Sequence, residues 1–248
     1  MTAKVHGVMD AAGYDQLIRA IVPAQPLLLS TIIDSLPEDC GSILELGCGT
    51  GILTGMIREA RPRAEITGID LSPEMLKVAS GKLGLESVTF LARDLRDPWP
   101  EKTFDAIVTS LCLHHVSPND RYSVARRAAR VLNPGGRFIC GDIFRAATDW
   151  EERLLTESWV RAMKRGGAPG EVIDGMIRQR AERRPFLSTI EGFRRSLVDA
   201  GFSRCWVPFR SGFVGLVAGE AETSLSSGGE GEASPLKVPR VGSLLCKP

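Results

Sequence analysis

Short apolar runs alternate with amphipathic segments between residues 42 and 141, and this alternation restricts the fold more than any other feature of the sequence. Such spacing is typical of right-handed β-α-β units and a parallel sheet. Each run is apolar at both alternating positions, as in strands covered by helices on both faces. We therefore predict an α/β fold with a doubly wound, mostly parallel sheet. The expected strands are 42–46, 65–69, 88–92, 106–110 and 137–141, with helices near 51–60, 73–82 and 121–132.

The flanking segments depart from this alternation. The apolar stretch 14–36 predicts one or two helices interrupted at Pro23, lying over the sheet or its ligand. Two strands, 204–209 and 212–218, are separated only by Arg210 and Ser211, which predicts an antiparallel pair at one sheet edge. The remaining expected helices are 149–164, 171–184 and 189–200.

The chain of 248 residues is 43% hydrophobic, enough for one sizeable core. We expect three parts. Residues 1–39 would form an N-terminal helical cap, and 40–219 a ligand-binding domain with a helical lid at 149–185. Residues 220–248, rich in Glu, Ser and Gly, would form a disordered tail.

The balance of charges and the spacing of the cysteines restrict the classes of partner and the cellular location that we expect. Lys and Arg total 31 against 30 Asp and Glu, so no overall field draws the chain to nucleic acid or an anionic membrane. A small-molecule substrate is favoured, and a homodimer remains open. The six cysteines lack metal-like spacing, which predicts reduced thiols, no metal site and a cytoplasmic location. The apolar run 21–33 contains two prolines and fits neither a signal peptide nor a membrane span.

A glycine-rich turn follows the first expected strand and opens a helix, in the order Glu45-Leu46-Gly47-Cys48-Gly49-Thr50-Gly51. Glycine lets the backbone bend sharply and approach a ligand closely, which favours a nucleotide-type ligand over a generic tight turn. The dinucleotide pattern fails because its third glycine would fall at Ile52 or Thr54, and no P-loop Gly-Lys-Ser/Thr follows. A nucleoside such as S-adenosylmethionine fits better.

Two acidic residues end the next strands. Asp70 lies about twenty residues past the glycine turn, where a carboxylate can accept hydrogen bonds from both ribose hydroxyls. Ser72 is the better candidate for capping the following helix. Asp94 follows the third strand and is placed to meet an adenine amino group, or else to pair with Arg93 or Arg96.

Five motifs together resemble those of class I S-adenosylmethionine-dependent methyltransferases: E-L-G-C-G-T-G, G-I-D-L-S-P-E-M-L, A-R-D-L, F-D-A-I-V-T-S-L-C-L-H-H-V and L-N-P-G-G-R-F. The resemblance covers residues 40–142 and implies a seven-stranded sheet with a reversed last strand. It implies S-adenosylmethionine as cofactor, with the glycines against its methionine part, Asp70 on the ribose and Met75 near the adenine. The expected cofactor-binding residues are Tyr14, Glu45, Gly47, Cys48, Gly49, Gly51, Asp70, Leu71, Met75, Asp94, Leu95 and Ser110.

A closer resemblance extends to about residue 218, to methyltransferases related to carboxy-S-adenosylmethionine synthase of tRNA uridine modification. The lid segment Lys164-Arg165-Gly166-Gly167-Ala168-Pro169 lacks the aromatic residue that the synthase pattern leads us to expect. Methyl transfer is therefore favoured over carboxymethyl chemistry. A non-catalytic, cofactor-binding partner subunit is the other alternative.

Three polar residues follow the fourth and fifth strands at the expected ligand-binding edge: His114, His115 and Asp142. Either histidine has the chemistry of a general base, although the pair could instead only pack beside the cofactor. Trp150, Trp159, Met163 and Met176 lie on the expected lid and are interpreted as packing residues. Methyl transfer needs mainly alignment and desolvation, so no fixed catalytic triad is expected.

Overall fold

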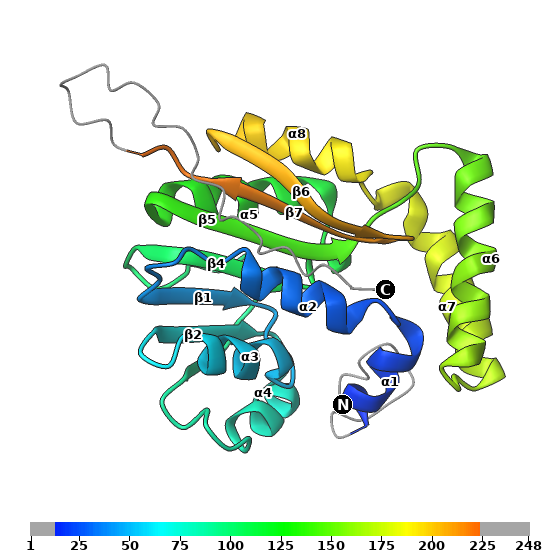
Figure 1. The fold of residues 1–248 in the computed structure, drawn as a ribbon, viewed down its shortest axis with the longest axis horizontal. Coiled ribbons are helices and arrows are strands. Elements are labelled where there is room, and N and C mark those ends of the chain that lie inside the picture. Colours follow the sequence, from blue (N-terminus) through cyan, green and yellow to red (C-terminus); the bar gives the residue numbers. More distant parts are fainter. Residues whose placement is uncertain (1–12, 224–248) are drawn as a thin grey trace, which may run out of the picture.

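The computed structural model describes residues 13–223, which form one seven-stranded sheet in the order β3-β2-β1-β4-β5-β7-β6 (Figure 1). Strands β3, β2, β1, β4 and β5 pair in parallel, and β7 runs antiparallel to both of its neighbours. The predicted doubly wound sheet with a reversed last strand is confirmed. The strands are β1 (Ser42–Leu46), β2 (Glu65–Asp70), β3 (Thr89–Ala92), β4 (Phe104–Ser110), β5 (Leu132–Ile143), β6 (Arg204–Ser211) and β7 (Val214–Glu220).

Helices cover both faces of the sheet because the central strands are apolar at successive positions. Ile43 of β1 packs with Ile32 of α2 in one core cluster. Its neighbour Leu44 belongs to a second cluster with Val124 of α5 and Leu197 of α8. The helices are α1 (Tyr14–Ile21), α2 (Gln25–Asp34), α3 (Ile52–Ala60), α4 (Pro73–Ser80), α5 (Pro118–Val131), α6 (Asp149–Arg165), α7 (Gly170–Arg183) and α8 (Ile190–Ala200), with short 3-10 turns η1 (Leu113–His115) and η2 (Arg184–Phe186).

The β6–β7 hairpin lies at the sheet edge as predicted, but its turn was placed two residues too early. Strand β6 continues through Ser211, and the chain reverses at Gly212 and Phe213. Gly212 has φ +58°, a left-handed conformation that glycine adopts readily in hairpin turns. Strand β5 likewise begins earlier than predicted, at Leu132, with a register shift before Arg137 pairs with Ala106.

Helices α6 and α7 stand at one end of the sheet, beside α1 (Figure 1). The indole nitrogen of Trp159 in α6 donates to the carbonyl of Ile21 in α1 at 2.6 Å. Met163 is fully buried, as predicted for a packing residue. The same prediction was wrong for Trp150, which is 67% exposed because it lies in the first turn of α6, away from the core.

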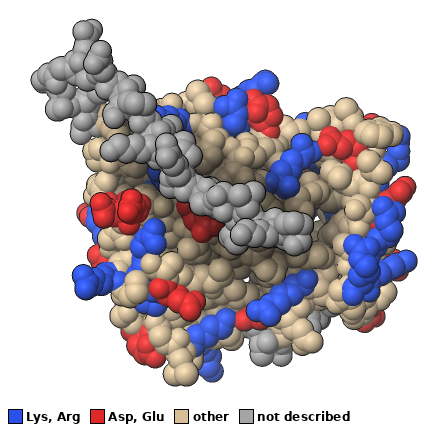
Figure 2. All heavy atoms as spheres, in the orientation of Figure 1, with Lys and Arg blue, Asp and Glu red and all other residues tan. Residues whose placement is uncertain are grey.

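The N-terminal apolar stretch breaks into α1 and α2 around Pro23, as predicted. Within residues 13–223 no single helix has the length and hydropathy to cross a membrane; α1 and α2 satisfy both only when taken together, and they meet at a 97° bend. The first part of the expected N-terminal cap, 1–12, and most of the expected tail, 224–248, lie outside the described residues. On the face drawn in Figure 2, basic and acidic side chains are interspersed.

Candidate active site

The turn after β1 carries three glycines in the left-handed region, with φ +72° at Gly47, +54° at Gly49 and +79° at Gly51. A Cβ on Gly47 would lie 2.2 Å from the Sγ of Cys112, whereas a Cβ on Gly49 would meet nothing within 4 Å. Gly47 is therefore required by packing within the protein. Gly49 instead faces open space, as a backbone that a ligand approaches closely should.

Asp70, at the end of β2, fixes this turn from the neighbouring strand. Its Oδ2 accepts a hydrogen bond of 2.7 Å from the amide of Gly49, and its Oδ1 accepts one of 2.9 Å from the amide of Ser72. Burial raises the pKa of Asp70, and the amides of Ser72, Gly49 and Leu71 oppose that rise. A carboxylate has about four acceptor positions, so both oxygens keep capacity for a ligand's hydroxyl groups.

A cleft of about 490 Å³ opens beside Asp70, and a recess of about 50 Å³ continues it beneath the glycine turn. Most of the predicted cofactor residues line one or both. Gly51 lines neither cavity. A Cβ at this position would lie 3.1 Å from the Cβ of Ala79, so the glycine serves the packing of the start of α3 against α4. The cleft is lined by Asp70, Leu71, Met75, Asp94 and Leu95, the recess by Glu45 and Cys48, and both by Tyr14, Gly47, Gly49 and Ser110.

Asp94 is already paired. Its two oxygens accept hydrogen bonds of 2.9 and 2.6 Å from the Nε and Nη2 of Arg96, and this guanidinium lowers the pKa of the carboxyl. The pairing with Arg96 considered in the sequence is thus present. Binding of an adenine amino group by Asp94 stays a prediction.

Glu45 sits under the recess with 1% of its surface exposed. Its Oε2 accepts a hydrogen bond of 2.6 Å from the hydroxyl of Thr54. Burial raises the pKa of Glu45 to about 8, with the Asp70 charge adding to the rise and the Thr54 hydroxyl opposing it. The Glu45 carboxyl is therefore mostly protonated at neutral pH.

The two histidines of η1, His114 and His115, have different surroundings. The Nδ1 of His114 lies 2.6 Å from the Oδ1 of Asp142, and the His114 amide donates to Oδ2 at 2.8 Å. The amide of Ile143 also donates to Oδ1, at 2.8 Å. Since the carboxylate is the acceptor in each contact, this network assigns the ring proton to Nδ1 and leaves Nε2 as an acceptor. His115 instead lines the cleft beside Asp70.

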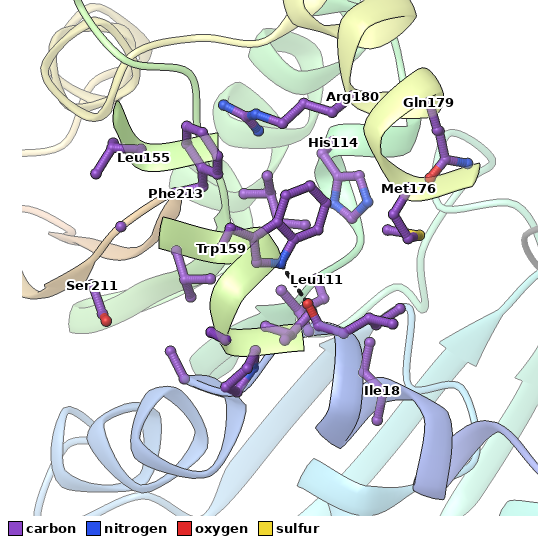
Figure 3. Close-up of a pocket in the computed structure, with 18 of the residues that line it drawn as sticks. Ile18, Leu111, His114, Leu155, Trp159, Met176, Gln179, Arg180, Ser211 and Phe213 are labelled. Atoms are coloured by element: carbon purple, nitrogen blue, oxygen red, sulfur yellow. Dashed lines mark hydrogen bonds between the residues drawn. The ribbon is translucent and has the colours of Figure 1, made fainter. Parts of the chain in front are cut away.

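His114 borders a second cavity, a chamber of about 180 Å³ between α1, α6, α7 and the β6–β7 turn (Figure 3). Most of its lining is apolar. Trp159 lies at its centre in the close-up, with His114, Leu111 and Met176 around it. Figure 3 also labels Ile18, Leu155, Gln179, Arg180, Ser211 and Phe213 in the lining.

Tyr14 and Leu111 line the cleft, the recess and the chamber, and so mark where the three meet. Leu111 has φ +51°, an unfavourable conformation for a leucine that costs about 1 to 2 kcal/mol. Burial raises the pKa of Tyr14 to about 12, so its phenol stays protonated at neutral pH. The strain at Leu111 had no signal in the sequence beyond its place after the fourth strand.

Residues 43–136 match the model of a family described as a methyltransferase domain. The chain is 40% identical over 98 residues to the demethylmenaquinone methyltransferase of Tropheryma whipplei strain Twist, a match covering 39% of each protein. It is 31% identical over 163 residues to a ubiquinone biosynthesis O-methyltransferase of Xanthomonas oryzae pv. oryzae, 63% of this chain and 65% of that protein. The matches thus span less than two thirds of these relatives' lengths.

Solved structures share the fold. The plantazolicin methyltransferase BpumL, in complex with a triazolic desmethylPZN analogue and SAH, superposes with a TM-score of 0.62 at 17% identity over 85% of this chain and 89% of that one. The DhpI–SAH complex gives a TM-score of 0.58 at 22% identity over 85% and 91%. The arrangement of strands and helices is therefore that of class I methyltransferases.

Proposed function

We propose that this chain, whose residues 43–136 match the model of a methyltransferase domain, is an S-adenosylmethionine-dependent methyltransferase that acts on a small molecule. The observation that carries the proposal is the contact between Asp70 and Gly49. It joins the ends of β2 and β1 around a cleft whose backbone is open to a ligand. The methyltransferases reported above, none of them named as a carboxy-S-adenosylmethionine synthase, support methyl transfer.

The residues present fit the cofactor. The open space at Gly49 suits its methionine part, and the remaining acceptor capacity of Asp70 suits the ribose hydroxyls. Met75, which is buried, and Leu71, which is 70% exposed, offer apolar surface to an adenine ring. An exposed leucine at the rim of a cleft is accounted for if a ring covers it.

When bound, S-adenosylmethionine supplies a methyl group on a positive sulfonium; the acceptor's electron pair forms the new bond to carbon, and the carbon–sulfur pair stays on the leaving thioether. We propose that the Nε2 of His114 takes the acceptor's proton, while Asp142 holds the ring and balances its charge. Tyr14 and Leu111 exclude water where the cavities meet. His115, bordering the cleft, would position the cofactor.

The chamber supports a small molecule as the acceptor. It adjoins the cleft through Tyr14 and Leu111, so an acceptor held there lies next to a cofactor in the cleft. The two relatives named for menaquinone and ubiquinone biosynthesis also suggest a small organic acceptor. We propose that the lid, residues 149–185, covers this chamber and selects the acceptor, since α6 and α7 supply much of its wall.

The test is product formation. Purified protein is incubated with S-adenosylmethionine and a panel of small hydroxylated, aminated and thiol acceptors, and mass spectrometry follows S-adenosylhomocysteine and any product heavier by one methylene. We expect both to appear together for at least one acceptor. Carboxymethylated products, or no turnover despite cofactor binding, would contradict methyl transfer.

A further inference from the structure

Arg183 lies at the end of α7, at the wall of the acceptor chamber. Its Nη1 is 3.0 Å from the Nδ1 of His115, which borders the cofactor cleft, and 3.4 Å from the carbonyl of His114. Neither partner is a carboxylate, so neither contact neutralises the charge of the guanidinium. Arg183 thus contacts the backbone of the residue proposed as the base and lines the same chamber.

The chamber's two arginines differ in how their charges are balanced. Arg180 is buried, its Nε donates to Glu152 at 2.7 Å, and its guanidinium carbon lies 3.1 Å from the centre of the Phe213 ring. Arg183 has no carboxylate within ion-pair distance in the part of the chain that the structure describes, 13–223. The charge of Arg180 is thus neutralised within the protein, whereas that of Arg183 is available to a ligand anion.

Much of the remaining lining of the chamber is apolar. Trp159, Met176 and Phe213 contribute to it, and the space measures about 180 Å³. An engineered protein cavity of about 150 Å³ lined by apolar side chains binds benzene. One ring therefore fills most of the chamber, and the aromatic and thioether side chains favour it.

We propose that the acceptor is a hydroxylated monocyclic acid: an apolar ring in the chamber, its hydroxyl at His114 and its carboxylate paired with Arg183. The inference rests on the proposed function, because the site of transfer defines where the hydroxyl must lie. Asp142 does not repel the carboxylate strongly, since its oxygens accept from His114 and from the amide of Ile143 rather than facing the chamber.

The probes are 2-, 3- and 4-hydroxybenzoate, each compared with the uncharged hydroxybenzamide of the same shape. Each is titrated by calorimetry into the wild-type protein, with and without S-adenosylhomocysteine. Arg183→Gln removes the charge, and Arg178→Gln, an exposed arginine on the same helix, is the matched control. Circular dichroism checks that each variant is folded.

We expect at least one hydroxybenzoate to bind saturably, with affinity at least tenfold lower in Arg183→Gln and within twofold of wild type in Arg178→Gln. The matching benzamide should lose less than threefold in either variant. The inference is overturned if no hydroxybenzoate binds, or if acid and amide respond equally to Arg183→Gln. Failure of S-adenosylhomocysteine to bind would count against the proposed function instead. The titrations without it would still show whether the chamber binds a hydroxylated acid through Arg183.

Discussion

The Nδ1 of His114 lies 2.6 Å from the Oδ1 of Asp142, and the two side chains are only 9% and 5% exposed. The second oxygen of Asp142 accepts from the backbone amide of His114 itself, so one carboxylate fixes both the ring and the turn that carries it. A pair that merely fills space would not need this double attachment. The geometry is that of an imidazole held in one tautomer.

Replacing either member of this pair should slow transfer to a hydroxyl acceptor. His114→Gln removes the proposed proton acceptor, and Asp142→Asn leaves the ring without its anionic partner. General acid–base catalysis contributes typically about 10²- to 10⁴-fold, so kcat should fall within that range for His114→Gln. S-adenosylhomocysteine affinity, measured by calorimetry, should stay within threefold. Wild-type turnover by His114→Gln would show that the acceptor needs no base from this residue.

Two neighbouring glycines should respond differently to alanine. Gly47 and Gly49 share a positive φ, so the conformational penalty is similar, but only the Cβ at Gly47 would collide with Cys112. We expect Gly47→Ala to lower the melting temperature by at least 5 °C more than Gly49→Ala. Gly49→Ala should chiefly weaken cofactor binding, because its methyl group occupies ligand space. Equal melting temperatures for the two variants would contradict this assignment.

Glu45 should make stability depend on pH. Its pKa is about 8 in the folded chain against an ordinary value of 4.5, so between these values the folded state binds the proton that the unfolded state has lost. The free energy of unfolding should therefore fall as pH rises from about 5 to 8, by about 1 kcal/mol per pH unit from this group, and level off above 8. Urea denaturation of wild type and Glu45→Gln checks this. The difference between their slopes should vanish above pH 8; parallel curves throughout would show that Glu45 is not protonated.

The ion pair between Glu152 of α6 and Arg180 of α7 should stabilise the packing of these two helices, since both side chains are less than 10% exposed. Glu152→Gln leaves the guanidinium buried without its anion, which costs about 3 to 5 kcal/mol in comparable pairs. Glu157→Gln is the control, because the Glu157–Arg161 pair is on the surface and should contribute under about 1 kcal/mol. Limited proteolysis should cut α6–α7 faster in Glu152→Gln alone. Similar digestion of both variants would show that the ion pair between Glu152 and Arg180 does not stabilise α6 and α7.

Much of the sheet could be predicted because its signals are local. Successive residues are apolar in runs such as 106–108, which is typical of a strand covered on both faces. Ser72 caps α4, and its hydroxyl accepts a hydrogen bond of 3.2 Å from the amide of Met75. The hairpin turn was misplaced because Gly212 reads in the sequence as a strand residue. Only its pairing with the neighbouring strand shows that it reverses the chain.

The meeting of the residues proposed to bind the cofactor could be predicted from the sequence, whereas that of the residues proposed to bind the acceptor could not. Gly49 and Asp70 lie at consecutive strand ends, and a parallel sheet brings those ends together. The sequence could not separate His114 from His115, because η1 directs adjacent residues into different cavities. In the sequence, Arg183 is one of several arginines between residues 149 and 185. Its lack of an acidic partner among residues 13–223 depends on how α7 packs against η1.

The most direct test of the account is a calorimetric titration of S-adenosylhomocysteine into wild type, Asp70→Asn and, as a control, Asp39→Asn at an exposed position. Hydrogen bonds to a charged group contribute about 1.5 to 3 kcal/mol, so the account predicts one site per chain in wild type and roughly ten- to a hundredfold weaker binding in Asp70→Asn. Asp39→Asn should match wild type. No binding by wild type, or equal affinity in Asp70→Asn, would contradict the placement of the cofactor between β1 and β2.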